Sequence, residues 1–99
     1  MPFGGQAYPF NSIVVAGLNE VGAVYGLFQY SPATGIYHCQ YVGQTDNLRR
    51  RLQEHLSNPP VAGLTHFFAE TYSSVAQRLA RESALIAEFQ PIGNTQLRW

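Results

Sequence analysis

A chain of 99 residues is long enough for one domain with one modest core. It is 45% hydrophobic and 13% aromatic, with 12% charged residues, which excludes a disordered segment. The formal net charge of zero argues weakly against a nucleic-acid binder, because such proteins usually carry a basic face. The single cysteine, Cys39, excludes an internal disulfide and a thiolate metal cluster built from one chain. No apolar run approaches the ~18–20 residues of a membrane span and no signal-peptide pattern opens the chain, so we expect a cytoplasmic protein.

The first half of the chain predicts an arm followed by a hairpin. Residues 1–20 show no periodic pattern and are expected to form an N-terminal arm, with a possible short extra element, a strand or buried turn, at 13–16. Residues 23–30 are rich in β-branched and aromatic side chains, which favours a strand. The turn signals at 31–35 and the second β-rich run at 36–42 make the pair an antiparallel hairpin. Strict alternation would place three side chains of the second strand on one face: Tyr37, Cys39 and Tyr41.

A helix is predicted after this hairpin. Gly43 is expected to end the strand, and Thr45 or Asp46 can cap the helix. Apolar residues then recur every four positions: Leu48, Leu52 and Leu56. This spacing is typical of the buried stripe of a helix, which the Asn-Pro-Pro run at 58–60 would end.

The last third of the chain predicts one more strand and one more helix. Residues 64–70 fit the strand, and Ser74 with Gln77 has the spacing of a capping box. Four residues are expected to face inward from the second helix: Val75, Leu79, Ile86 and Phe89. Pro91 and Gly93 would end it, and residues 96–99 are expected to form a tail. The fold class is therefore α/β (α+β), with a small three-stranded antiparallel or mixed sheet flanked by helices in the order β-β-α-β-α.

Five side chains near the ends of these elements could share one site. They are two phenols, a guanidinium, an imidazole and a carboxylate: Tyr25, Tyr41, Arg51, His55 and Glu82. This set suits phosphodiester cleavage, because an arginine can stabilise charge on a phosphate and a carboxylate can hold a hard divalent cation. A tyrosine or a histidine can accept a proton from an attacking water.

Each candidate also has an ordinary structural interpretation. Strand tyrosines are most often packing residues, and His55 could simply favour the end of its helix. Arg49 and Arg50 are expected to be a solvated face that also contacts DNA phosphates. Glu82 is the most informative member, because a glutamate beside the inward stripe of a helix is costly to bury without a partner.

The spacing of these residues resembles that of the GIY-YIG endonuclease superfamily over residues 21–95. The second half-motif is Tyr41-Val42-Gly43, and the arginine of the family falls ten positions after its tyrosine, with a common histidine four later. The run at 47–52 matches the usual lead past that arginine. The C-terminal signature is met by five residues: Glu82, Leu85, Ile86, Pro91 and Asn94.

The first half-motif of the family is matched less closely by this sequence. The string Gly35-Ile36-Tyr37 is too close to Tyr41, because the two half-motifs of the family occupy neighbouring strands. Ala23-Val24-Tyr25 is the better candidate, with Ala in place of Gly and Val in place of Ile.

The resemblance implies a metal-dependent DNA endonuclease that hydrolyses phosphodiester bonds by single-displacement attack of water. It implies one divalent cation, Mg²⁺ or Mn²⁺, at Glu82, with Arg51 stabilising charge, Tyr41 and His55 orienting the reactants, and Tyr25 as general base or relay. DNA is the implied partner, with a possible homodimer or accessory DNA-binding partner, and repair, restriction or mobile-element roles stay open. The alternative is a non-catalytic nucleic-acid or protein interaction module that retains the fold.

Overall fold

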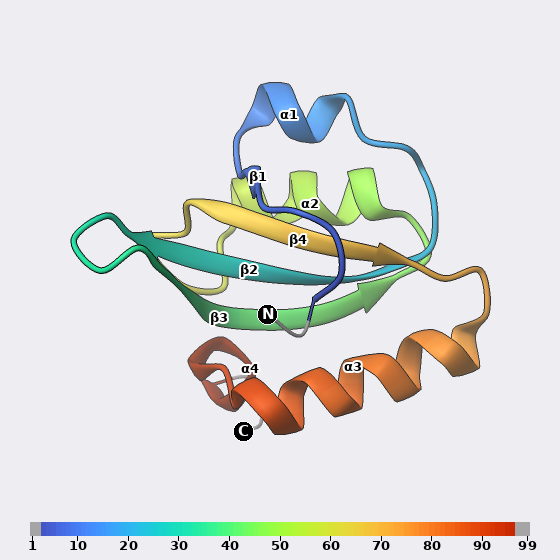
Figure 1. Cartoon of the computed structure of the whole chain (residues 1–99). Coiled ribbons are helices and arrows are strands. Elements are labelled where there is room, and N and C mark those ends of the chain that lie inside the picture. Colours follow the sequence, from blue (N-terminus) through green and yellow to red (C-terminus); the bar gives the residue numbers. More distant parts are fainter. Residues whose placement is uncertain (1–2, 97–99) are drawn as a thin grey trace.

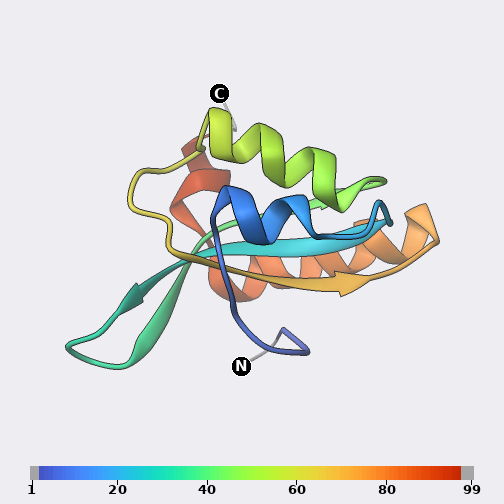
Figure 2. The same ribbon diagram turned by 90° about the horizontal axis from the view of Figure 1, so that it is seen from above.

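The computed structural model describes residues 3–96, and in it a four-stranded sheet lies between two layers of helices (Figure 1). The elements in chain order are β1 (Tyr8–Pro9), α1 (Ser12–Ala16), β2 (Ala23–Ser31), β3 (Ile36–Thr45), α2 (Leu48–Ser57), β4 (His66–Thr71), α3 (Val75–Phe89) and α4 (Ile92–Gln96). The strand order is β1-β4-β2-β3, and every pair is antiparallel. Helices α1 and α2 cover one face, and α3 covers the other (Figures 1 and 2). None of the helices in the described range is long and apolar enough to cross a membrane.

The sheet has one strand more than the three predicted. The extra strand, β1, has only two residues, pairs through Tyr8 with Phe67, and includes Pro9. So short a strand, with a proline at the sheet edge, leaves no alternating pattern in the sequence. The run at 13–16, expected as a strand or buried turn, lies in helix α1, which Asn11 caps by accepting a hydrogen bond from the Val14 amide. The tail was expected at 96–99, but Gln96 is the last residue of helix α4, and residues 97–99 lie outside the described residues.

The β2–β3 hairpin forms as predicted, but a bulge changes which side chains share a face. Leu27 pairs with Tyr41 and Phe28 with Cys39, so Gln40 is an extra residue on β3. One extra residue reverses the alternation beyond it. Cys39 therefore packs toward α3 with Tyr37, whereas Tyr41 packs on the α2 side. The prediction that Tyr37, Cys39 and Tyr41 share a face was wrong, because the bulge turns Tyr37 and Cys39 to the face opposite Tyr41. Tyr41 shares the face of Tyr25 because it lies two residues from Gly43, the pairing partner of Tyr25.

Strand β3 continues through Gly43, which was expected to end it, because Gly43 and Thr45 remain paired with β2. The cap of α2 is consequently Asn47 rather than Thr45 or Asp46, and its side chain accepts a hydrogen bond from the Arg50 amide at 3.0 Å. The predicted stripe is confirmed, since Leu48 and Leu52 are buried and Leu56 packs against the same core. The helix ends at Ser57, before the Asn-Pro-Pro run.

Helix α3 begins at the predicted cap but presents a different face. The Ser74 side chain accepts a hydrogen bond from the Gln77 amide, as expected. Val75 and Leu79, however, are 56% and 47% exposed. The buried residues are Arg78 and Leu85, with Glu82 and Phe89 half-buried between and after them. The helix has small or apolar residues on most of its surface, so periodicity alone could not identify the side that faces the sheet.

The C-terminal helix α4 closes the open edge of β3. Helix α3 ends at Phe89 and is capped by Gln90, which adopts the left-handed conformation at φ 46°. Gly93 therefore lies inside α4 rather than ending α3. A Cβ at Gly93 would lie 2.7 Å from the Gln40 carbonyl oxygen. Asn94 then bonds both main-chain groups of Val42, accepting from its N–H at 2.8 Å and donating to its carbonyl at 2.7 Å. These bonds satisfy the outward main-chain groups of Val42 on the edge strand.

Candidate active site

Two tyrosines and a histidine meet on the face of the sheet that α2 covers. Tyr25 is 0% exposed and its hydroxyl lies 2.7 Å from Nε2 of His55, which is 5% exposed. The Tyr41 ring stacks beside Tyr25 with centroids 6.2 Å apart and meets His55 edge-on at 5.1 Å. These three rings therefore form one aromatic wall, with the Tyr25–His55 hydrogen bond inside it.

Gly43 makes room for this wall. It pairs with Tyr25 across the hairpin, and a Cβ at Gly43 would lie 2.5 Å from the Tyr25 hydroxyl oxygen and 3.0 Å from a ring carbon of Tyr41. No side chain fits at that distance. Gly43 thus serves close packing within a strand, not the turn that the sequence suggested.

An open cleft of about 640 Å³ lies in front of the wall. Its lining consists of Tyr41, Arg51, Glu54, His55, Asn58, Pro59 and Pro60. Arg51 and His55 are one turn apart on α2, so both side chains reach the same cleft. Arg51 donates from Nη1 to Oε1 of Glu54 at 2.9 Å, and both side chains remain partly exposed. The cleft therefore combines one cation, one carboxylate, a phenol and an imidazole.

Burial determines the protonation states of Tyr25 and His55 in the aromatic wall. Desolvation, followed by the nearby charge of Arg51, lowers the pKa of His55 to about 4, so its imidazole is neutral near pH 7. Desolvation, with the neighbouring Tyr41 phenol, raises the pKa of Tyr25 well above its ordinary value, although Arg51 opposes this shift. Tyr25 and His55 are therefore a neutral hydrogen-bonded pair, and Tyr25 is poorly suited to act as a direct general base.

Glu82 is not in the cleft. It lies on α3, which packs on the opposite face of the sheet (Figure 1). Its half-buried carboxylate lies near the main chain of the edge strand β3. Desolvation raises the pKa of Glu82, and interaction with the main-chain amide of Gln44 opposes that rise. The structure thus brings together Tyr25, Tyr41, Arg51 and His55, and it places Glu82 around the edge of β3 from them.

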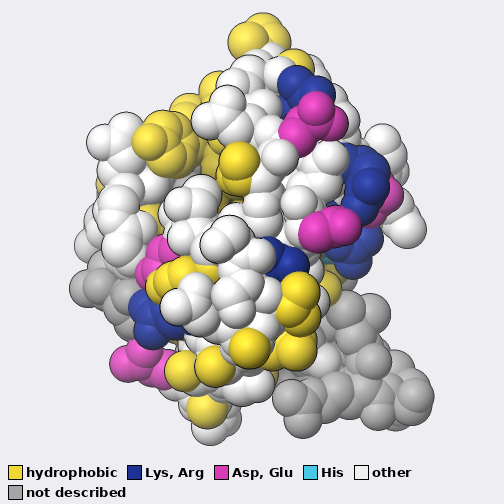
Figure 3. Space-filling model, turned by 90° about the vertical axis from the view of Figure 1, so that its right-hand side faces the viewer, with side chains coloured by type: hydrophobic (Ala, Val, Ile, Leu, Met, Phe, Trp, Pro, Cys, Tyr) yellow, Lys and Arg dark blue, Asp and Glu magenta, His cyan; other side chains and the backbone are white. Residues whose placement is uncertain are grey.

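The remaining arginines of α2 are paired at the surface. Arg49 contacts Glu20 at 3.0 Å and Arg50 contacts Asp46 at 3.0 Å. Figure 3 shows basic side chains lying beside acidic ones rather than forming a basic patch. Both arginines therefore lie at the surface, in agreement with their interpretation as a solvated face.

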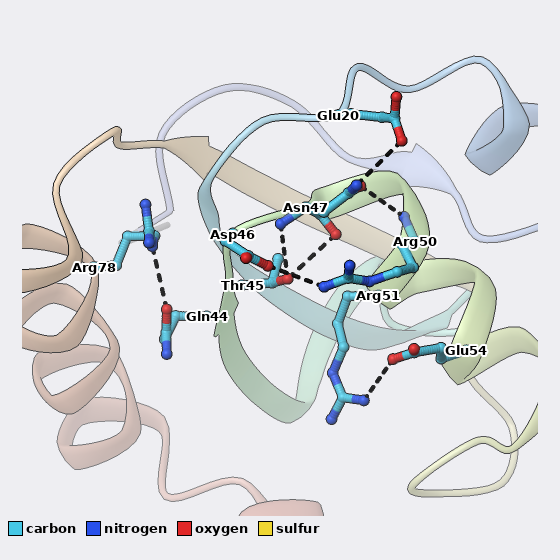
Figure 4. Close-up of polar contacts among 9 residues, drawn as sticks. All are labelled: Glu20, Gln44, Thr45, Asp46, Asn47, Arg50, Arg51, Glu54 and Arg78. Carbon is cyan, nitrogen blue, oxygen red and sulfur yellow. Dashed lines mark hydrogen bonds and ion pairs between the residues drawn. The ribbon is translucent and has the colours of Figure 1, made fainter.

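Three residues of the site region were not singled out in the sequence. Glu54 has only the i, i+3 spacing from Arg51 as a signal, and Gln44 simply follows Gly43. Arg78 donates from Nε to Oε1 of Gln44 at 3.2 Å, and no sequence pattern marked it as buried. Figure 4 shows both contacts, Arg51 with Glu54 and Arg78 with Gln44.

Comparison with known proteins identifies the fold. No protein-family model matches the chain, and no curated protein sequence does either. Among solved structures, the GIY-YIG N-terminal endonuclease domain of UvrC from Thermotoga maritima, bound to its catalytic divalent cation magnesium, matches with a TM-score of 0.63 at 19% identity. That match covers 80% of this chain and 89% of the other. A point mutant of the same domain, bound to its catalytic divalent cation, matches with a TM-score of 0.64 at 18% identity, covering 82% and 90% of the two chains. The chain therefore has the fold of the GIY-YIG endonuclease domain, as its motifs predicted.

Proposed function

We propose that this chain is a metal-dependent endonuclease that hydrolyses phosphodiester bonds in DNA. The observation that carries the proposal is the convergence of Tyr41, Arg51 and His55 on one open cleft, backed by Tyr25. These residues come from β2, β3 and α2, and their predicted roles depended on spacing alone. The solved structures with the same fold are endonuclease domains bound to a catalytic divalent cation, which supports the same activity here.

The donor set fits a hard divalent cation with few protein ligands. Within residues 3–96 no group of three or more His, Cys, Asp or Glu side chains could hold a metal ion. Glu82 is half-buried, desolvated and without an ion pair among the described residues. Mg²⁺ commonly takes one or two carboxylates and keeps several waters, whereas Zn²⁺ would need three or four protein ligands. Glu82 would hold Mg²⁺ or Mn²⁺, and the bound ion would acidify a water and neutralise phosphate charge.

Arg51 is assigned to the phosphate. Its guanidinium opens into the cleft and offers more donors than its single bond to Glu54 uses. Charge accumulates on the phosphate oxygens as the water oxygen bonds to phosphorus and the bond to the leaving oxygen breaks. A fixed cation at that point stabilises the transition state more than the ground state.

Tyr41 is assigned to the attacking water and Tyr25 to positioning. Of the two phenols, Tyr41 lines the cleft and Tyr25 does not. The Tyr41 hydroxyl can accept a hydrogen bond from the water and direct its lone pair toward phosphorus. Tyr25 holds the His55 ring by the bond to Nε2, so His55 presents its other ring nitrogen in a fixed direction.

The DNA would be bound weakly by this domain alone. Arg49 and Arg50 are proposed to contact flanking phosphates, but each must first exchange an acidic partner. Such exposed pairs are worth little and are screened by salt, so the exchange is feasible. A homodimer or an accessory DNA-binding partner would supply further surface.

Cleavage of supercoiled plasmid DNA with Mg²⁺ tests the proposal. The wild-type protein should nick the DNA, and Glu82→Ala and Arg51→Ala should each lower the rate by about 10²-fold or more. The control is Glu88→Ala, an exposed glutamate on the same helix, which should cut at the wild-type rate. Equal cutting by all four proteins would refute the proposed site. DNA binding without any cleavage would favour the interaction module instead.

A further inference from the structure

Arg78 is a buried cation with no ion pair among the described residues. It is 5% exposed, and its guanidinium donates to the side-chain oxygen of Gln44 at 3.2 Å and to the carbonyls of Tyr72 and Ser73 at 2.8 and 3.2 Å. Gly22 leaves space for it, because a Cβ there would collide with Nη1. Burying a guanidinium against neutral partners costs more than burying an apolar chain of the same length. Stability of the fold alone therefore does not account for an arginine at position 78.

The bond from Arg78 determines how the Gln44 amide is oriented. A guanidinium can only donate hydrogen bonds, so Oε1 of Gln44 must face it. The amide nitrogen then points away from Arg78, as Figure 4 shows. Without Arg78 the amide would be free to rotate about its last torsion.

Gln44 also connects Arg78 to Glu82. On the edge strand β3, the main-chain groups of Val42 point outward to Asn94, and those of Gln44, two residues on, point to the same side. The main-chain N–H of Gln44 lies near enough to Glu82 to oppose the rise in the pKa of its carboxyl group that burial causes. Arg78 and Glu82 are one turn apart on α3, so both side chains lie toward the same segment of β3, and Arg78 is hydrogen-bonded to it through Gln44.

We propose that Arg78 is a positioning residue for the divalent-ion site: through Gln44 it holds the edge of β3 against α3, so that the Glu82 carboxylate stays at the outer edge of that strand. This inference rests on the proposed function, because it takes Glu82 as the ligand of the ion. Arg78 touches neither the ion nor the phosphate. Partners behind a ligand typically change metal affinity by about 10–100-fold when they are removed.

The test is Mn²⁺ binding to the purified protein, measured by electron paramagnetic resonance, with thermal unfolding of each variant followed by circular dichroism. Wild type should bind Mn²⁺ and Glu82→Ala should not. Arg78→Met should bind Mn²⁺ about 10-fold more weakly while its melting temperature stays at or above that of wild type, since a buried charge has been replaced by an apolar chain. A purely structural role would lower the melting temperature and leave the affinity of the folded protein unchanged.

Arg81→Met is the matched control. Arg81 is on the same helix and makes a two-point ion pair with Glu70, at 2.8 and 3.1 Å, on the sheet. Its loss should lower the melting temperature and leave Mn²⁺ affinity within about twofold of wild type. Arg78→Lys, which keeps one donor toward Gln44, should recover part of the affinity.

The outcomes separate the two proposals. If wild type binds no Mn²⁺, or if Glu82→Ala binds it equally, the proposed metal site fails. If wild type binds and Glu82→Ala does not, but folded Arg78→Met binds as tightly as wild type, the role of Arg78 alone is refuted. Weakening by Arg81→Met equal to that by Arg78→Met would also refute it, because the effect would then not pass through Gln44.

Discussion

Acidification should destabilise the protein through His55. The pKa of His55 is about 4 in the fold, against an ordinary value of about 6.5, because the ring is buried beside Arg51. The unfolded chain therefore binds the proton more readily, and stability from this residue is complete above pH 6.5 and falls as the pH drops toward 4. Between the two pKa values the loss is about 1.4 kcal/mol per pH unit, or about 2 kcal/mol between pH 6.5 and 5.

Urea unfolding of wild type and His55→Gln at pH 7 and pH 5 measures this contribution. Wild type should lose about 2 kcal/mol more than the variant over that interval. The lowered pKa values of Glu54 and Glu70 affect stability only below their ordinary range. The raised pKa of Glu82 acts in the opposite sense in both proteins, so the comparison cancels its contribution.

A direct titration of the His55 ring by nuclear magnetic resonance provides a second measurement that does not depend on the variant. Midpoint protonation near pH 6.5 would contradict the neutral pair with Tyr25, as would an equal loss of stability in both proteins.

Three further changes test the packing and charge of the site. Gly43→Ala should destabilise the fold by about 2–3 kcal/mol in urea unfolding, because its Cβ would press on the Tyr25 hydroxyl at 2.5 Å. Asn94→Asp keeps one acceptor but loses the donor to the Val42 carbonyl, which should lower the free energy of unfolding by about 1–3 kcal/mol. This loss should become smaller at low pH, where the aspartic acid is protonated. An unchanged urea midpoint would show that α4 does not stabilise the edge of β3. Glu54→Gln removes the carboxylate that shares Arg51, so fluorescence anisotropy should show DNA binding a few-fold tighter at low salt, and weaker binding would show that Glu54 instead helps to orient the arginine.

Local sequence signals were sufficient to predict the elements that depend on residues close together in the chain. Periodicity at 48, 52 and 56 specified the buried stripe of α2, and Ser74 with Gln77 specified the start of α3. The linked spacing from Tyr41 to Arg51 and His55 identified side chains that do converge, because a strand leading into a helix carries its residues to one end. Motif spacing therefore identified the fold that comparison with solved structures shows.

The tertiary structure decided what depends on neighbours distant in the chain. The bulge at Gln40 places Tyr37 and Cys39 on the face opposite Tyr41, and only the pairing of β3 with β2 reveals it. The sequence suggested a turn at Gly43, but the absence of a side chain at Gly43 leaves space for the Tyr25 ring from the neighbouring strand. The inward side of α3 was set by Arg78 and Leu85 meeting the sheet, since the apolar stripe of Val75 and Leu79 was equally plausible by period. The sequence by itself determined which residues are close along the chain. The burial that sets charge and packing depends on contacts between segments far apart in the chain, such as Tyr25 with His55 and Val42 with Asn94, and no local pattern encodes these contacts.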